Sequence, residues 1–292
     1  MGVTQAQCVV DCKDVLGESP VWSAAESALY WIDVARPTLH RLDVHTGEHK
    51  RWDMGKPIGS FVLRERGGFL MAYRNGLALL DTPDAQPQWI RPPGLELGEA
   101  RFNDGKCDRQ GRFWVGTMDR NVKSAIGRLF RLDPDLSLHE IDQDIVISNG
   151  PCFSPDDRYF YFNDSPRQIT WRYEFDAVNG VASHRQTFVD WHAFAGRPDG
   201  ATVDAEGGLW VAEVHGHRVV RFRPDGTIDR WIEVPCERPT SVCFGGPDLR
   251  TLYITSSTLS LSEASLAAAP LSGGLFAADA GVAGIAERPF AG

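Results

Sequence analysis

The sequence lacks the features that mark several large classes of protein. It has no apolar run long enough to cross a membrane and no block of Lys or Arg, and its formal net charge is −9. These absences argue against a membrane protein and against nucleic acid as a partner. No G-x-S-x-G motif is present, which disfavours serine hydrolase chemistry. The first residues lack the charged and apolar parts of a secretory leader.

Cysteine usage and overall composition indicate a reduced, globular protein. The six cysteines include no C-x-x-C pair, which fits a cytoplasmic location. Hydrophobic residues make up 42% of the chain and charged residues 24%, and the β-branched and aromatic residues gather in short runs. We expect one domain spanning residues 1–292, because propellers and barrels often use this length as a single unit.

One hairpin-like pattern recurs along the whole chain. Each copy has an apolar residue, a polar turn that usually contains glycine, and then a β-rich run. The apolar residues before these turns recur every 40 to 50 residues and are Trp22, Leu63, Cys107, Phe153, Val203 and Cys243. Further short strands and Asp/Pro/Gly turns bring each unit to four strands, as in a propeller blade. The sequence therefore predicts an all-β, six-bladed β-propeller.

Two segments outside the repeats receive their own predictions. Residues 7–12 form a short strand-like segment ahead of the first repeat. Because a ring of sheets must close, we expect this segment to complete the last blade by pairing near residues 274–277. Almost no helix is expected, and residues 262–267 are the candidate for a single turn.

One position of the repeat collects polar side chains. Four residues before the apolar residue of each repeat stand Glu18, Gly59, Asn103, Asn149, Asp199 and Pro239. Equivalent positions of propeller blades face the same axis, so Glu18, Asn103, Asn149 and Asp199 should bring four oxygen donors together. Such donors favour Ca²⁺, Mg²⁺ or Mn²⁺ and tolerate Zn²⁺ or Fe²⁺. We therefore predict an axial site for one divalent metal ion.

The individual motifs also have simpler interpretations. Taken singly, Asn149-Gly150 and Asn103-Asp104-Gly105 are typical of turns, and only their shared register favours a metal site. Arg101 and Arg197 each precede one of these polar residues by two positions. An axial arginine would bind hydroxyls or a developing anion, whereas the alternative, equally good for Arg197, is a salt bridge at the rim.

Motifs along nearly the whole chain resemble those of the senescence marker protein-30, gluconolactonase and luciferin-regenerating enzyme family, whose members are six-bladed propellers with one axial divalent metal. The matching segments are Leu16–Trp22, Arg101–Gly105, Trp114–Met118, Ser148–Pro151, Pro198–Gly200, Phe244–Asp248 and Leu271–Phe276. The chain is most similar to bacterial sugar-acid lactonases. The resemblance implies hydrolysis of an aldonolactone to its aldonic acid.

The resemblance also implies residue roles. It makes Glu18, Asn149 and Asp199 metal ligands, with Asp199 also the acid/base, and makes Arg101 and Asn103 contacts to the substrate. Many members have a substrate-binding Glu shortly after the Gly-Thr-Met run. This chain has Asp119-Arg120-Asn121 there, which leaves that role to Asn121 or Asp119.

Two other functions remain open from the sequence. A related lactonase or phosphotriesterase could use the same metal, although the polar residues of the expected mouth favour sugars. The alternative that is not an enzyme is a calcium-binding or ligand-binding propeller without turnover. The expected partner is a small sugar lactone, and the expected state is a monomer or a weak homo-oligomer.

Overall fold

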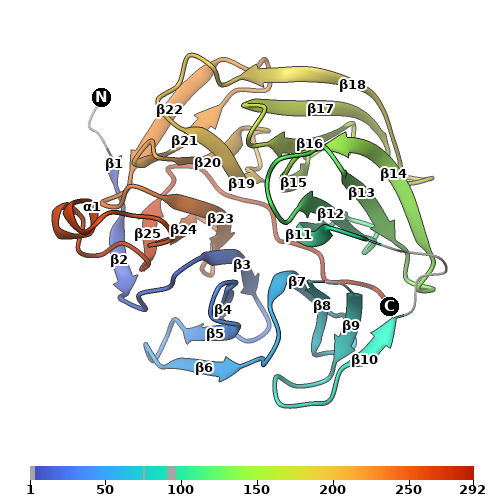
Figure 1. Ribbon diagram of the computed structural model, residues 1–292, viewed down its shortest axis with the longest axis horizontal. Helices are drawn as coiled ribbons and strands as arrows, with labels where there is room; N and C mark the ends of the chain where they lie inside the picture. The colour runs from blue at the N-terminus through green and yellow to red at the C-terminus, as the bar shows by residue number, and fades with distance from the viewer. Residues whose placement is uncertain (1–3, 75, 91–96) are drawn as a thin grey trace.

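The computed structural model describes residues 4–74, 76–90 and 97–292, which form six sheets arranged as blades around an axis (Figure 1). The strands of a blade are antiparallel and follow one another from the axis outward. Blade 1 contains β3 (Gly17–Ser23), β4 (Ala28–Asp33), β5 (Thr38–Asp43) and β6 (His49–Asp53). Blade 2 contains β7 (Ile58–Leu63), β8 (Phe69–Tyr73), β9 (Gly76–Leu80) and β10 (Gln88–Ile90). Blade 3 contains β11 (Ala100–Cys107), β12 (Phe113–Asp119), β13 (Gly127–Leu132) and β14 (Leu138–Ile145).

The second half of the ring repeats this plan. Blade 4 contains β15 (Ser148–Phe153), β16 (Tyr159–Asp164), β17 (Ile169–Asp176) and β18 (Val181–Asp190). Blade 5 contains β19 (Arg197–Val203), β20 (Leu209–Val214), β21 (Arg218–Phe222) and β22 (Ile228–Glu233). Blade 6 contains β23 (Pro239–Gly245), β24 (Thr251–Ser256) and β25 (Leu275–Asp279). The predicted six-bladed propeller is confirmed.

The N-terminal segment closes the ring. Strand β2 (Gln7–Val10) pairs antiparallel with β25, with Cys8 opposite Phe276, and supplies the fourth strand of blade 6. The predicted closure is therefore confirmed. The two residues of β1 (Thr4–Gln5) add a parallel edge to β22 of blade 5, so the N-terminal segment joins two neighbouring blades.

The apolar core is divided among the gaps between blades. Six clusters of buried residues each combine side chains from two neighbouring blades, as Tyr30 and Phe61 do between blades 1 and 2, and Trp210 and Phe244 do between blades 5 and 6. Because both faces of a blade are covered, its middle strands are apolar on both sides. The helix α1 (Glu263–Ala268) is short, as predicted. Among the described residues no helix is long and apolar enough to span a membrane.

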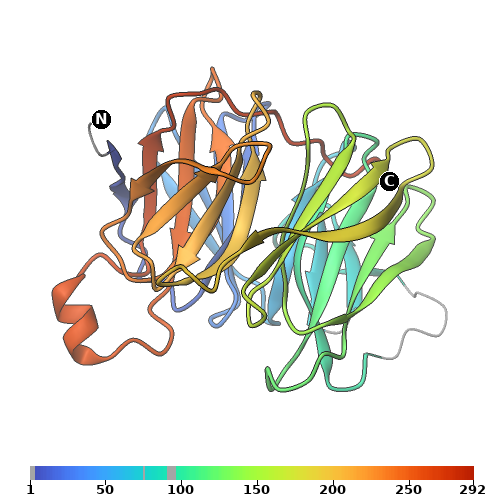
Figure 2. The same ribbon diagram turned by 90° about the horizontal axis from the view of Figure 1, so that it is seen from above.

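The C-terminal segment, residues 280–292, runs across one end of the axis (Figure 2). The Ala205 N–H donates to the Ala283 carbonyl at 2.9 Å in blade 5, and the Phe290 N–H donates to the Leu63 carbonyl at 2.8 Å in blade 2. The segment thus covers the hairpins that follow the innermost strands. We call this the closed end and the opposite end, where the innermost strands begin, the open end.

One repeat position needs correction. In blade 5 the last paired residue of the innermost strand is Val203, as predicted, but in blade 6 pairing continues to Gly245, opposite Thr251. The predicted Cys243 therefore lies inside the strand.

Candidate active site at the open end of the axis

Each of the six innermost strands contains a β-bulge beside the candidate position. The ladder registers shift between Glu18 and Val21, Ile58 and Ser60, Phe102 and Gly105, Asn149 and Cys152, Pro198 and Ala201, and Pro239 and Ser241. A bulge leaves a residue unpaired and re-aims its side chain, and bulges are frequent beside active sites. Asn103 and Asp199 lie inside their bulges, while Glu18 and Asn149 are the last paired residues before theirs.

Glycine allows the inner strands to approach closely at this level. A Cβ on Gly59 would lie 2.5 Å from the Phe102 carbonyl oxygen, and a Cβ on Gly200 would lie 2.1 Å from the Ser241 Oγ. Both distances are shorter than real contacts allow. Blade 2 therefore offers no side chain at the axial position, because its strand lies directly against the backbone of blade 3.

Asparagines from blades 3 and 4 meet at the open end. The Asn103 Nδ2 donates to the Asn149 Oδ1 at 2.5 Å and to the Ser148 carbonyl at 2.9 Å. The Asn149 Nδ2 donates to the Ser165 Oγ at 2.8 Å. These bonds fix which way the Asn149 amide faces, so its oxygen is directed away from Ser165 and toward the neighbouring blade.

Three carboxylates act on one another at this end. Burial, followed by the charges of Asp199 and Asp104, raises the pKa of Glu18 well above its ordinary value. Burial and the charge of Asp104 likewise raise the pKa of Asp199. Among the described residues none of the three carboxylates makes a salt bridge, although Arg101 and Arg238 lie near enough to oppose these shifts. The three carboxyl groups of the site therefore lie close together without a paired cation among the described residues.

Asp104 is not among the residues that sequence reasoning assigned to the metal or to the substrate. It is only 9% exposed, and its two oxygens accept the N–H groups of Gly105 at 2.8 Å and of Gly150 at 2.7 Å. The bond to Gly150 ties blade 3 to blade 4 beside Asn149. The available signal was its place in the Asn103-Asp104-Gly105 motif, next to a predicted site residue.

The donor set fits a divalent cation. Glu18 and Asp199 are half-buried, and the one bond that a Glu18 oxygen accepts, from the Ser19 N–H, is long at 3.3 Å. Like charges that lie close together are costly unless a bound cation compensates them. Within the described ranges no group of three or more His, Cys, Asp or Glu side chains is placed to hold a metal, so a cation here would depend on two carboxylates and an amide.

Arg101 and Asn103 are in direct contact. The Arg101 Nη1 donates to the Asn103 Oδ1 at 2.9 Å and to the Phe102 carbonyl at 2.9 Å. The Asn103 oxygen therefore faces Arg101, while its N–H faces Asn149. This orientation suits a substrate contact better than metal ligation, and both roles of Asn103 stay predictions.

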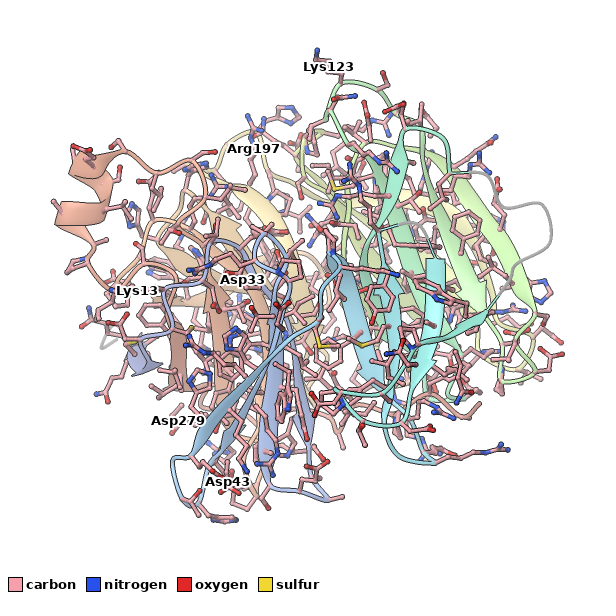
Figure 3. The ribbon with its side chains drawn as sticks, turned by 60° about the horizontal axis from the view of Figure 1, so that its bottom comes forward. Lys13, Asp33, Asp43, Lys123, Arg197 and Asp279 are labelled. Atoms are coloured by element: carbon pink, nitrogen blue, oxygen red, sulfur yellow. The ribbon has the colours of Figure 1, made fainter. Side chains whose placement is uncertain are left out.

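Asp119 and Asn121 occupy different environments on the loop after β12. The Asp119 carboxylate accepts the N–H groups of Asn121 at 3.0 Å, of Lys123 at 3.0 Å and of Ser124 at 2.8 Å. These bonds lower the pKa of Asp119 and hold the loop in place. Asn121 is exposed, and Lys123 of the same loop lies at the same end of the molecule as Arg197 (Figure 3). Of the two, Asn121 has the side chain that is free to contact a substrate.

Fold and site together define a six-bladed propeller with an acidic and amide-lined centre at one end of its axis. Residues 16–258 match the family described as the SMP-30/Gluconolactonase/LRE-like region. The chain belongs to this family.

Three named proteins illustrate what the chain is similar to. It is 43% identical over 293 residues to a 6-deoxy-6-sulfogluconolactonase of Pseudomonas putida, covering 98% of each chain. It is 38% identical over 248 residues to the pentonolactonase XacC of Haloferax volcanii, covering 85% of this chain and 84% of the relative. The solved structure of a calcium-binding protein, regucalcin, from Agrobacterium tumefaciens superposes with a TM-score of 0.93 at 27% identity, covering 99% of both chains.

Proposed function

We propose that this protein hydrolyses sugar lactones to sugar acids with the help of one divalent metal ion bound at the open end. The observation that carries the proposal is the group formed by Glu18, Asp199 and Asp104, which has no paired cation among the described residues. Relatives named as lactonases of a six-carbon and a five-carbon sugar acid support this reaction class.

The proposed ligands are Glu18, Asn149 and Asp199. Oxygen donors of this kind suit Ca²⁺, Mg²⁺ or Mn²⁺, and Zn²⁺ or Fe²⁺ are tolerated. When bound, such an ion supplies Lewis acidity toward the lactone carbonyl and an anchor for its oxygen. The hydrogen bonds of Asn149 to Asn103 and Ser165 would keep its oxygen oriented toward the ion.

The proposed proton shuttle is Asp199. Its carboxylate would take a proton from the attacking water as the water oxygen bonds to the lactone carbonyl carbon. The bond between that carbon and the ring oxygen then breaks, and the proton passes to the ring oxygen, which becomes a hydroxyl. Arg101, Asn103 and Asn121 would bind the sugar hydroxyls around the mouth, with Asp119 holding the loop that presents Asn121.

Binding without turnover is the second candidate, because the superposed Agrobacterium protein is named for calcium binding. The test is to remove metals with a chelator, restore Ca²⁺, Mg²⁺, Mn²⁺, Zn²⁺ or Fe²⁺ one at a time, and follow acid release above spontaneous ring opening. The panel should hold neutral pentono- and hexonolactones. It should also hold the 6-sulfonated gluconolactone that the name of the Pseudomonas putida relative describes.

The expected result is hydrolysis that disappears with chelation and returns with at least one ion. A protein that binds the ions tightly by calorimetry and hydrolyses no lactone of the panel would instead be a binding protein.

A further inference from the structure

Three arginines gather beside the candidate site at the open end. Arg101 lies on β11, Arg74 follows β8 of blade 2, and Arg120 follows β12 of blade 3. The backbone holds them together, because the Phe102 N–H donates to the Arg74 carbonyl at 3.1 Å and the Arg120 N–H donates to the Glu99 carbonyl at 3.1 Å. Arg74 and Arg120 therefore flank the start of the strand that carries Arg101.

Arg74 is exposed, and Arg101 and Arg120 are half-buried. None of the three has an acidic partner among the described residues, whereas the buried arginines of the blades do. Arg112, for example, pairs with Asp108 at 2.6 Å, and Arg221 pairs with Asp204 at 2.7 Å. By contrast, the Nε of Arg120 is buried and has no hydrogen-bond partner in the part of the chain that the structure describes. A buried donor without a partner is costly, so its presence points to a group that arrives from outside.

The electrostatics of Arg101 agree with this geometry. Arg74 and Arg120 lie near enough for their positive charges to act on the Arg101 guanidinium. Guanidinium groups gathered in this way repel one another, and an oxyanion relieves the repulsion, since each planar guanidinium can donate two parallel hydrogen bonds to sulfonate, phosphate or carboxylate oxygens.

We propose that Arg74 and Arg120, beside Arg101, form a subsite for an anionic group on the sugar lactone, at the end of the substrate remote from the lactone carbonyl. This inference rests on the proposed lactonase function and specifies its substrate class as acidic sugar lactones. The carboxylates near the axis would keep that group away from the reacting end, because like charges repel. The two kinds of charge at the open end thus orient the substrate.

The test compares lactones that differ only at carbon 6. We would measure kcat/KM for glucono-1,5-lactone, 6-phosphogluconolactone and 6-deoxy-6-sulfogluconolactone with the wild type, Arg74→Gln and Arg120→Gln. Arg223→Gln is the matched control, because Arg223 lies in the turn after β21, at the closed end, and pairs there with Asp229 at 2.5 Å. Thermal unfolding and circular dichroism establish that each variant is folded.

The expected result is a wild-type preference for at least one anionic lactone. Each arginine variant should lose about 10- to 100-fold in kcat/KM on that lactone, the range for a hydrogen-bonded charge pair, and stay within about threefold on the neutral one. Added salt should reduce the preference. Whichever anionic lactone gives the higher kcat/KM shows whether sulfonate or phosphate is the better ligand.

Equal rates on all three lactones, or equal losses on neutral and anionic lactones in both variants, would overturn the subsite while leaving the lactonase function intact. If no lactone is hydrolysed, the proposed lactonase function is wrong, and a binding measurement then tests the anion subsite by itself. Calorimetry with 6-deoxy-6-sulfogluconate and 6-phosphogluconate needs no turnover. Binding of either acid that is weakened in Arg120→Gln but not in Arg223→Gln would support the subsite, and absence of binding would contradict it.

Discussion

Two groups of charged residues in the same blades differ in how their charges are paired. Toward the closed end, Asp108 accepts hydrogen bonds from the Trp114 Nε1 at 2.9 Å and the Arg112 Nε at 2.6 Å. Blade 5 repeats this arrangement around Asp204, with Trp210 and Arg221 both at 2.7 Å. Lys106 pairs with Glu287 of the C-terminal segment at 2.6 Å.

At the open end, by contrast, the carboxylates of Glu18, Asp199 and Asp104 and the arginines at positions 74, 101 and 120 make no salt bridges among the described residues. Buried charge pairs stabilise a structure, because removing one partner leaves the other charge buried without a counterion. Unpaired buried charges cost stability and are typical of functional sites. Away from the axis the open end also has paired carboxylates, such as Asp164 with Arg167. The comparison therefore separates the paired groups that stabilise the propeller from the axial group that we propose binds substrate.

The largest effect is expected for Asp199→Asn at the open end. The amide keeps an oxygen for a metal, but it cannot take a proton from water at neutral pH. Loss of general-base assistance should lower turnover by about 10²- to 10⁴-fold, with a much smaller change in metal affinity. We would measure lactone hydrolysis at rising metal concentration, with Asp225→Asn, on an exposed turn at the closed end, as the control.

Recovery of a near wild-type rate at saturating metal would remove Asp199 from the chemistry. The base would then be sought in another carboxylate of the open end. Asp104 comes first, because it lies near both Glu18 and Asp199.

The sequence was sufficient to predict the ring of blades, but not how the C-terminal segment joins the blades at the closed end. Hairpin turns at a fixed spacing and alternating apolar runs are local signals, so the six blades and the pairing of β2 with β25 followed from them. The C-terminal segment forms no regular repeat, and its contacts with Leu63 and Ala205 join residues far apart in the chain. The extension of β23 to Gly245 was missed because the predicted hairpin position was set by the spacing of apolar residues alone.

For the site, the repeat register predicted which residues share the open end. It did not predict that the Asn103 oxygen faces Arg101, because a side-chain rotamer depends on neighbours that only the folded chain supplies. The same limit applies to Arg74 and Arg120, which stand 46 residues apart by their numbers and are brought together by the packing of blades 2 and 3. No short-range pattern marks such a group.

At the closed end, Asp108→Ala should lower the free energy of unfolding by about 3–5 kcal/mol. The reason is that the Arg112 guanidinium and the Trp114 Nε1 lose their shared partner in a buried position. Turnover per folded molecule should stay unchanged, because the pair lies away from the open end. Urea unfolding checks the prediction, and Asp225→Ala, exposed at the same end, should change stability by no more than about 0.5 kcal/mol. A loss as small as that of the control would show that this network does not stabilise the blade.

The smallest expected change in stability comes from Glu18→Gln. This variant should stabilise the metal-free protein, whereas Asp108→Ala should destabilise the protein. Metal affinity should fall about tenfold or more, since a carboxylate ligand becomes neutral. The metal-free variant should nevertheless be more stable than the metal-free wild type, by about 0.5–2 kcal/mol near pH 8. Replacing the carboxylate removes the cost of burying its charge first of all, and also its repulsion from Asp199 and Asp104.

The pH dependence fixes the sign of this last prediction. The folded-state pKa of Glu18 is raised, so the metal-free wild type loses stability as pH rises from the pKa of an unfolded Glu toward the folded value. Glutamine has no such loss, and the advantage of the variant should therefore shrink as pH falls toward 4. Calorimetry for metal affinity and urea unfolding at several pH values measure both quantities. A metal-free variant less stable than the wild type at every pH would mean that Glu18 stabilises the fold as the closed-end carboxylates do.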